Sequence, residues 1–310
     1  MTDIPLPAAL PARPTRQRVA WSMGGAVALV ASLGAGHVCA AAPAVGSSQL
    51  EAGPGAPAST GDDDEAPSRR SWDASVGFIA SLAPEYGGAA RQRVQIEPGF
   101  FVRLGRVSLA SRGAFVVRGA DGGGGGGLRV DLSRSERWRM GLGLRIDGGR
   151  RESSSSDLEG LGDVRRTVRA RLGGSYRFDG GWRAGGAITV DALGRDGGTI
   201  GELSLGRDLR SGPRTSVGVG ASLSFGDARH QQSYFGITPR QSARSGYPAY
   251  APGAGLRSAS LGVGARTALA EDWVVLYGAN VSRLLGPAAA SPLTRRPTSW
   301  GLNAGLVYRF

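Results

Sequence analysis

The last residues of the chain alternate strictly between apolar side chains and smaller or polar ones. From Trp300 to Phe310 every second residue is apolar or aromatic, and those between are glycine, asparagine, valine or arginine. Successive side chains of a β-strand point to opposite faces, so this segment predicts a strand with one apolar face. Two kinds of fold use such a strand. In a soluble β-sandwich the apolar face points inward, and in a membrane β-barrel it points toward lipid.

The faces opposite the apolar ones favour the barrel. In the segment 137–147, Leu142 and Leu144 alternate with Gly141, Gly143 and Arg145. Glycine makes up 52 of the 310 residues and aromatic residues only 7%. A soluble fold of this length normally buries many large apolar side chains, whereas a polar, glycine-rich inner face is typical of a barrel lumen.

Twelve segments alternate in this way. They are 72–81, 94–104, 107–118, 127–133, 137–147, 164–177, 181–193, 198–209, 213–225, 256–269, 272–284 and 299–310. Most have about the length of a tilted membrane strand. The sequence therefore predicts an all-β fold, a transmembrane antiparallel up-and-down β-barrel of about twelve strands in residues 72–310.

The lengths of the connections orient this barrel. Connections after even-numbered segments are short, and those after odd-numbered segments are long in all but one case. Outer-membrane barrels have short periplasmic turns and longer outside loops. We therefore expect both the N-terminus and the C-terminus of the barrel in the periplasm.

The N-terminal residues predict export. Residues 1–40 hold three arginines, a mostly apolar run and small residues around Cys39, which together predict a Sec signal peptide cleaved after Ala40 or Ala41. Lipidation of Cys39 is disfavoured because His37 and Val38 precede it. Residues 41–71, rich in Ala, Pro, Gly, Ser and acidic side chains, predict a disordered periplasmic linker. No later segment has the roughly 18 apolar residues of a spanning helix, so a membrane location requires a closed barrel.

The net charge of +12 comes from 37 basic residues, all of them arginine. They recur singly along the alternating segments, which argues against a nucleic-acid partner. We expect the lumen to be lined by Arg139, Arg145, Arg165, Arg169, Arg171, Arg177 and Arg266, facing Glu97, Asp147, Asp191, Glu202 and Asp208. Such a lumen is either a vestibule for anions or a polar plug of ion pairs, and the intermediate strand number favours the plug.

No catalytic, metal or cofactor site is expected. The chain expected after export has no cysteine and a single histidine, His230, between Asp227 and Ser233 in one connection. A catalytic triad needs its members on rigid, facing elements. The same connection, 226–255, carries the aromatic residues Tyr234, Phe235, Tyr247 and Tyr250 among prolines, and we expect this set either to bind a partner or to fold back as a constriction.

Several stretches resemble one family. They are GRRESSSSDLEGLGDV at 149–164, YFGITPRQSARSGYPAYAPGAGL at 234–256, SRLLGPAAASPL at 282–293 and the final YRF. They resemble the MipA/OmpV family, the MltA-interacting proteins of Gram-negative outer membranes, over residues 72–310. The glycine run at 122–127 and the segment 286–292 depart from the family pattern, both in expected outside loops.

The resemblance implies a location in the cell outer membrane, in contact with its lipids and lipopolysaccharide. It also implies a non-enzymatic scaffold that joins a lytic transglycosylase to a penicillin-binding protein in murein remodelling. Leu306, Tyr308 and Phe310 resemble the signal that the barrel-assembly machinery reads. The alternatives are an arginine-lined channel for small solutes and a surface adhesin that uses the connection 226–255.

Overall fold

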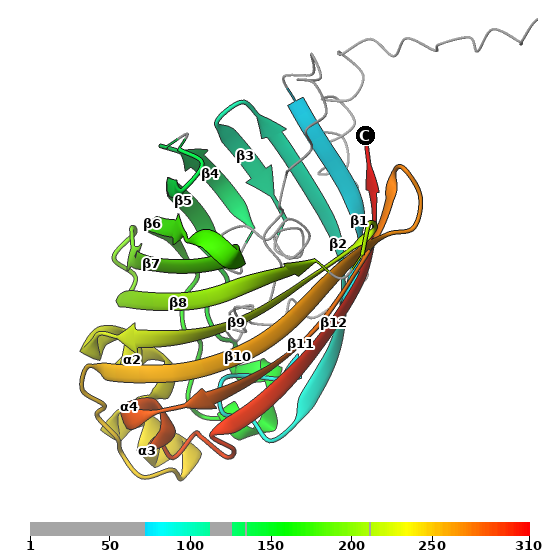
Figure 1. The fold of residues 1–310 in the computed structure, drawn as a ribbon. Coiled ribbons are helices and arrows are strands. Elements are labelled where there is room, and N and C mark those ends of the chain that lie inside the picture. Colours follow the sequence, from blue (N-terminus) through cyan, green and yellow to red (C-terminus); the bar gives the residue numbers. More distant parts are fainter. Residues whose placement is uncertain (1–71, 112–125, 134, 211) are drawn as a thin grey trace, which may run out of the picture. The chain divides into compact units, whose positions relative to one another are not determined.

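The protein is a closed β-barrel. The computed structural model describes residues 72–111, 126–133, 135–210 and 212–310. In this part of the chain twelve antiparallel strands pair in chain order, and β1 closes the sheet on β12 (Figure 1). This confirms the predicted fold class. The predicted signal peptide and linker lie outside the described residues.

Each predicted segment overlaps one strand. The strands are β1 Trp72–Pro84, β2 Gln92–Leu104, β3 Val107–Ala110, β4 Gly127–Asp131, β5 Trp138–Asp147, β6 Thr167–Arg177, β7 Trp182–Asp191, β8 Thr199–Arg210, β9 Thr215–Gly226, β10 Gly255–Ala268, β11 Trp273–Leu284 and β12 Thr298–Arg309. Residues 112–118 of the third predicted segment, and residues 122–125 of the glycine run, lie outside the described residues.

The two ends of the barrel differ. At one end, the turn end, the strands are joined by the connections 105–106, 132–137, 178–181, 211–214 and 269–272. At the other end, the cap end, the strands are joined by the connections 85–91, 148–166, 192–198, 227–254 and 285–297. A sixth connection at this end, 111–126, is described only in part. We call the described connections of the cap end the cap.

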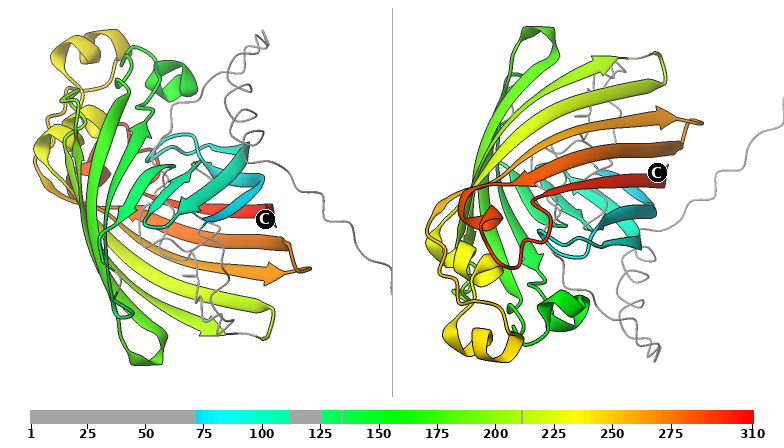
Figure 2. Two further views of the ribbon diagram at one scale, coloured as in Figure 1. Left: turned by 90° about the horizontal axis from the view of Figure 1, so that it is seen from above. Right: turned by 90° about the horizontal axis from the view of Figure 1, so that it is seen from below.

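The cap contains most of the helical turns. These are η2 Glu152–Ser154, η3 Ser156–Leu158, α2 Ala228–Phe235, α3 Pro239–Ser245 and α4 Gly286–Ala289, whereas η4 Asp179–Gly181 lies at the turn end. In both views of Figure 2 the helices α2, α3 and α4 lie beyond one end of the strands, and the C-terminus lies at the other. No helix in the described ranges is both long and apolar enough to cross a membrane.

The outer face of the barrel is apolar. Large hydrophobic side chains are exposed on strand after strand, among them Phe78, Ile96 and Ile146 with 67%, 70% and 71% of their surface open. They also pair across strands, as Leu142 does with Leu172 and Leu172 with Ile188. So much apolar surface is unfavourable in water and is the expected outer face of a barrel in lipid.

Aromatic side chains gather at the turn end. The contributing residues are Trp72, Trp138, Tyr176, Phe178, Trp182, Trp273, Tyr308 and Phe310. The rings of Trp273 and Tyr308 lie 5.2 Å apart and those of Tyr308 and Phe310 5.1 Å apart. Such a girdle is typical of a membrane interface. Leu306, Tyr308 and Phe310 lie on this outer face, and their role as an assembly signal stays a prediction.

The inner face is not polar throughout. Ile79, Val274, Leu276 and Val307 form a buried apolar cluster on β1, β11 and β12. Gly77 pairs with Val307, and a Cβ at Gly77 would lie 2.3 Å from the carbonyl oxygen of Leu306. Only glycine fits this close approach, so the wall of the barrel is packed here.

Single cysteines test the expected orientation, because the only native cysteine is Cys39 in the predicted signal peptide. Ala243, exposed in α3, and Ala270, exposed in the β10–β11 turn, offer the same substitution at opposite ends of the barrel. With an outward-facing cap, Ala243→Cys reacts with a membrane-impermeant maleimide on intact cells, and Ala270→Cys reacts only after the outer membrane is opened. The opposite pattern would invert the topology, and the unsubstituted protein is the control.

Candidate binding site beneath the cap

The connections of the cap share one apolar core. Tyr86, Ala89, Leu158, Leu161, Ile237 and Leu293 are buried against one another, although they come from four separate connections. The hydroxyl of Tyr86 donates to the carbonyl oxygen of Leu293 at 3.1 Å. The cap is therefore a packed body and not a set of independent loops.

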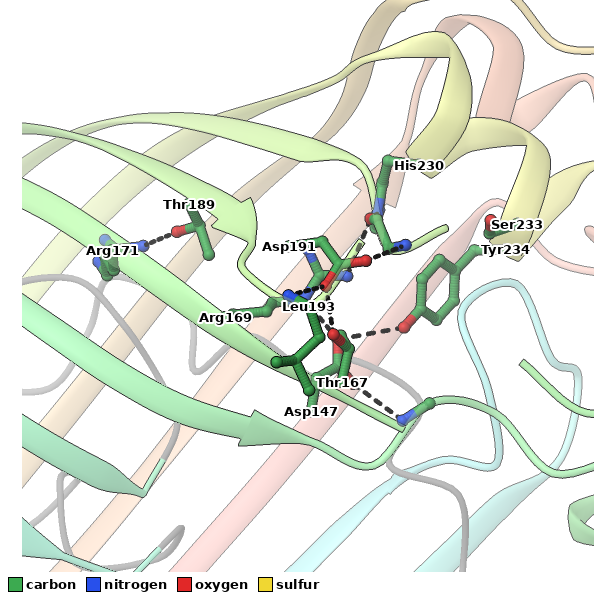
Figure 3. A network of polar contacts seen from close by, with 12 residues as sticks. Asp147, Thr167, Arg169, Arg171, Thr189, Asp191, Leu193, His230, Ser233 and Tyr234 are labelled. Atoms are coloured by element: carbon green, nitrogen blue, oxygen red, sulfur yellow. Dashed lines mark hydrogen bonds and ion pairs between the residues drawn. The ribbon is translucent and has the colours of Figure 1, made fainter. Parts of the chain in front are cut away.

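A buried polar network joins this cap to the barrel wall (Figure 3). Arg169, fully buried on the inner face of β6, donates through Nε to Oδ2 of Asp147 at 2.5 Å. The hydroxyl of Tyr234 in α2 donates to the same oxygen at 3.1 Å, and the backbone N–H of Gly149 donates to Oδ1 at 3.0 Å. One carboxylate thus holds a strand, a connection and a helix together.

The second half of the network fixes α2. The carbonyl oxygen of Gly197 lies 3.1 Å from Nη2 of Arg169 and 3.0 Å from Nδ1 of His230. Because a carbonyl only accepts, Nδ1 carries the proton and Nε2 has the lone pair. The carboxylate of Asp227 caps the helix by accepting from the N–H groups of His230 and Thr199.

Gly198 allows the connection between β7 and β8 to lie directly against the start of α2. Its φ is +63°, and a Cβ there would lie 2.3 Å from both Oδ1 of Asp227 and the backbone nitrogen of His230. No other residue fits without moving the start of α2.

His230 is held neutral at neutral pH. Its side chain is completely buried, and burial, followed by the positive charges of Arg257 and Arg169, lowers its pKa to about 3. Burial also raises the pKa of Tyr234 to about 12, helped by the charge of Asp147. The cap therefore contributes two neutral groups to a network whose charges come from Arg169 and Asp147.

The residues weighed as a triad have separate partners. Asp227 caps α2 through its carboxylate, His230 faces Gly197, and the hydroxyl of Ser233 donates to the carbonyl oxygen of Asp196 at 2.5 Å. No hydrogen bond joins these three side chains to one another in the described contacts. They serve to anchor a helix.

Most of the predicted lumen arginines lie on the inner face and are paired. Arg169 binds Asp147, and Arg171 binds Glu202. Arg139, Arg145 and Arg266 also point inward and have partners. Two further pairs, Arg183 with Asp208 at 2.9 Å and Arg103 with Asp131 at 2.8 Å, extend the pattern. This pairing favours the polar plug over the anion vestibule.

Two of the predicted arginines differ from the rest. Arg177 points inward on β6, opposite Arg183 on β7, and its Nη2 is buried without a hydrogen-bond partner. The prediction for Arg165 was wrong: its side chain is 71% exposed and pairs with Asp196 at 3.3 Å. The reason is that β6 begins at Thr167, so Arg165 still belongs to the cap.

The aromatic residues of the connection 227–254 hold the cap together. Burial argues against partner binding by Tyr234 and Phe235, whereas for the partly buried Tyr247 and Tyr250 this role stays a prediction. Tyr234 and Phe235 are buried, and Phe235 packs against Ala288. The hydroxyls of Tyr247 and Tyr250 donate to the carbonyl oxygens of Asp157 and Pro287 at 3.2 Å and 2.8 Å. The alternative expectation was that this connection folds back. Tyr234 does so, because its hydroxyl reaches Asp147 on the barrel wall.

A cavity of about 50 Å³ lies between this cap and the barrel wall. Its polar lining consists of two arginines and several serines, closed by aromatic and small residues: Arg150, Arg257, Ser258, Ser260, Ser282 and Ser299, with Pro84, Tyr86, Gly87, Gly88, Tyr234, Phe235 and Leu284. A water molecule needs roughly 10–15 Å³ of such space, so the cavity holds a few waters or one small solute.

Sequence reasoning missed both cavity arginines. Arg150 lies in a connection, where alternation says nothing about direction. Arg257 lies at a β-bulge, since the pairing of β10 with β9 shifts register between Leu256 and Ser258. The bulge leaves both Arg257 and Ser258 buried. A strict alternation with the outward Leu261 would have put Arg257 on the lipid side.

Three of the four serines that line the cavity belong to a longer row. Ser204, Ser222, Ser260, Ser282 and Ser299 occupy directly paired positions on β8 to β12. Each of the five has an outward apolar neighbour on its own strand, so all five face the lumen. The cavity lies where this row reaches the cap end.

Comparison with known proteins identifies the family. The model of the family described as "MltA-interacting protein MipA" matches residues 76–310. The chain belongs to this family. The match spans β1 to β12, so the MipA assignment covers nearly the whole barrel.

Solved structures resemble the chain only distantly. The NanC porin has 8% sequence identity and a TM-score of 0.37, over 77% of this chain and 100% of that one. OmpT of Vibrio cholerae has 9% identity and a TM-score of 0.33, over 77% and 98%. OprD of Pseudomonas aeruginosa has 8% identity and a TM-score of 0.31, over 77% and 94%. No curated protein matches the sequence.

Removing the charge of Asp147 should destabilise the protein strongly. Asp147→Asn keeps the shape of the side chain but leaves Arg169 buried without its counter-ion, which costs about 3–5 kcal/mol. Asp179→Asn makes the same change in an exposed pair with Arg137 and should leave stability unchanged. Urea unfolding of the two variants in lipid vesicles measures the difference. Equal stabilities would show that the network does not hold the cap.

The buried His230 should make the protein sensitive to acid. In the unfolded chain the imidazole titrates near its ordinary pKa of about 6.5, but in the folded protein near 3. Between these values the unfolded state binds a proton that the folded state refuses, so stability falls as pH decreases, by at most about 1.4 kcal/mol per pH unit from this group. His230→Asn should flatten the slope of unfolding free energy between pH 6.5 and 4. An unchanged slope would mean that His230 is not buried as described.

Proposed function

We propose that this MipA-family barrel is a non-enzymatic scaffold of the outer membrane, which brings together a lytic transglycosylase and a murein-synthesising penicillin-binding protein. The observation that carries the proposal is the family match across residues 76–310, since the family is described as MltA-interacting. The closed barrel with an apolar outer face supports an outer-membrane location.

The turn end offers a contact surface for such partners. With both termini in the periplasm, as we expect, the turns at this end face the murein. Four arginines are exposed there: Arg106, Arg137, Arg207 and Arg214. Arg207 stacks on the girdle residue Trp182 with its guanidinium carbon 5.4 Å from the ring centre. Glu136, Asp179, Glu271 and Asp272 are exposed at the same end, so the rim offers charges of both signs to a partner.

The internal contacts support a scaffold over an enzyme or an open channel. Asp227, His230 and Ser233 each bind a different partner, and Arg169, Arg171 and Arg183 on the inner face are each paired with a carboxylate. A protein whose interior is fixed in this way acts through its surface.

Site-specific photocrosslinking tests the scaffold. The chain contains no lysine, so amine-reactive reagents do not reach barrel side chains, and a photoreactive amino acid has to be placed at chosen positions. At Arg106 and Arg214 on the rim it should capture a lytic transglycosylase or a penicillin-binding protein, identified by mass spectrometry. At Ala243 in the cap it should capture neither. Recovery of assembly factors alone from the rim positions would refute the scaffold.

The second candidate is a channel for small solutes, favoured by the row of serines and the inward arginines. The pairing of Arg171 with Glu202 weighs against it, because a paired charge selects ions poorly. A defined conductance in planar bilayers that changes in Arg171→Gln but not in the exposed Arg165→Gln would favour the channel.

A further inference from the structure

Arg150 is a buried cation without a contacting carboxylate. Only 3% of its surface is exposed. Nη1 donates to the carbonyl oxygen of Tyr234 at 2.7 Å, whereas Nε is buried and has no hydrogen-bond partner. No ion pair is formed by Arg150 with any residue in the described ranges. It differs in this from Arg169, which has Asp147.

A buried guanidinium of this kind needs compensation. Its charge persists in proteins, and an unpaired buried charge or donor costs more free energy than a paired one. Burial accordingly lowers the pKa of Arg150 from its ordinary value. A second cation, Arg257, lines the same cavity and is 4% exposed, with Nε and Nη2 donating to the hydroxyl of Ser224. The Arg150 guanidinium, which contacts no carboxylate among the described residues, favours a negatively charged occupant of this cavity.

The barrel wall of the cavity supplies hydroxyl groups. Ser260, Ser282 and Ser299 are paired neighbours on β10, β11 and β12. The hydroxyl of Ser260 donates to that of Ser282 at 3.0 Å, which leaves the Ser282 hydroxyl its own proton to donate. Within the described residues this proton has no acceptor. Hydroxyl donors beside guanidinium groups suit the oxygen atoms of an anion.

We propose that this cavity binds one small oxyanion, a carboxylate or phosphate, between the guanidinium of Arg150 and the hydroxyl of Ser282. The volume of about 50 Å³ limits the ligand to the size of acetate, lactate or inorganic phosphate. The rings of Tyr86, Tyr234 and Phe235 also line the cavity, and apolar neighbours strengthen the contact of an anion with a cation. The site is independent of the scaffold role, because it lies at the opposite end of the barrel.

Calorimetric titration of the barrel, purified from outer membranes in a zwitterionic buffer, tests the site. Acetate, lactate and inorganic phosphate serve as separate probes, which distinguishes a carboxylate ligand from a phosphate. At least one should bind saturably with one site per chain. Arg150→Gln should weaken that binding tenfold or more, since it removes a charge-assisted donor. Arg165→Gln makes the same change at an exposed arginine and should bind as the unsubstituted protein does.

Two results would overturn the site: no saturable binding of any of the three anions, or equal binding by Arg150→Gln and Arg165→Gln. Heat-modified mobility in electrophoresis shows whether each variant is folded. If Arg150→Gln does not fold, Ser282→Ala decides, because it removes one hydroxyl from a regular strand and leaves the cap untouched. Ser282→Ala should weaken binding severalfold, and unchanged binding would refute the site.

Discussion

A strand in lipid cannot leave its backbone N–H and C=O groups unpaired, and the rest of this structure depends on that constraint. The solution is closure: β1 pairs with β12 from Ser75 and Arg309 to Leu82 and Leu302, and no described strand lacks two neighbours. Closure with antiparallel pairing requires an even number of strands. It also commits alternate side chains to the lumen, whatever their chemistry.

That commitment sets the electrostatics of the interior. Arginine on the inner face loses much of its hydration and therefore needs an anion from another strand, as Arg171 on β6 finds in Glu202 on β8. The same residue type behaves differently outside: Arg165 and Asp196 remain mostly exposed, and such pairs contribute about 0–1 kcal/mol. Breaking a buried pair costs several times more. The network around Asp147 can therefore fix the cap, while the pair at Arg165 has little influence on it.

The barrel could be predicted from the sequence, but most of the cap could not. Alternation is a local signal, so the inward faces of β5 and β6 follow from the residues themselves. The cap depends on contacts between distant connections, such as Tyr86 with Leu293, which no local pattern encodes. Its helices did leave a signal, because Thr238 and Gln241 form a capping box around Pro239. This capping signal predicts helical structure within the connection 227–254, and not an extended loop whose aromatic residues are exposed to a partner.

The cavity beneath the cap is lined both by residues that alternation predicts and by residues that it does not predict. Its serines follow from regular pairing, since Ser260, Ser282 and Ser299 occupy matched positions on three strands. Its arginines come from interruptions of that regularity, one in a connection and one at the bulge of β10. A bulge leaves a residue unpaired in the ladder, and here it brings a guanidinium to the buried side where a regular strand would have turned it to lipid. The positions of these serines are therefore fixed by the strand register of the barrel, because a change of register would expose their polar groups to the membrane. Arg150 belongs to a connection and is free of that constraint, so changes in the cap can alter which anion fits without disturbing the pairing that keeps the barrel closed.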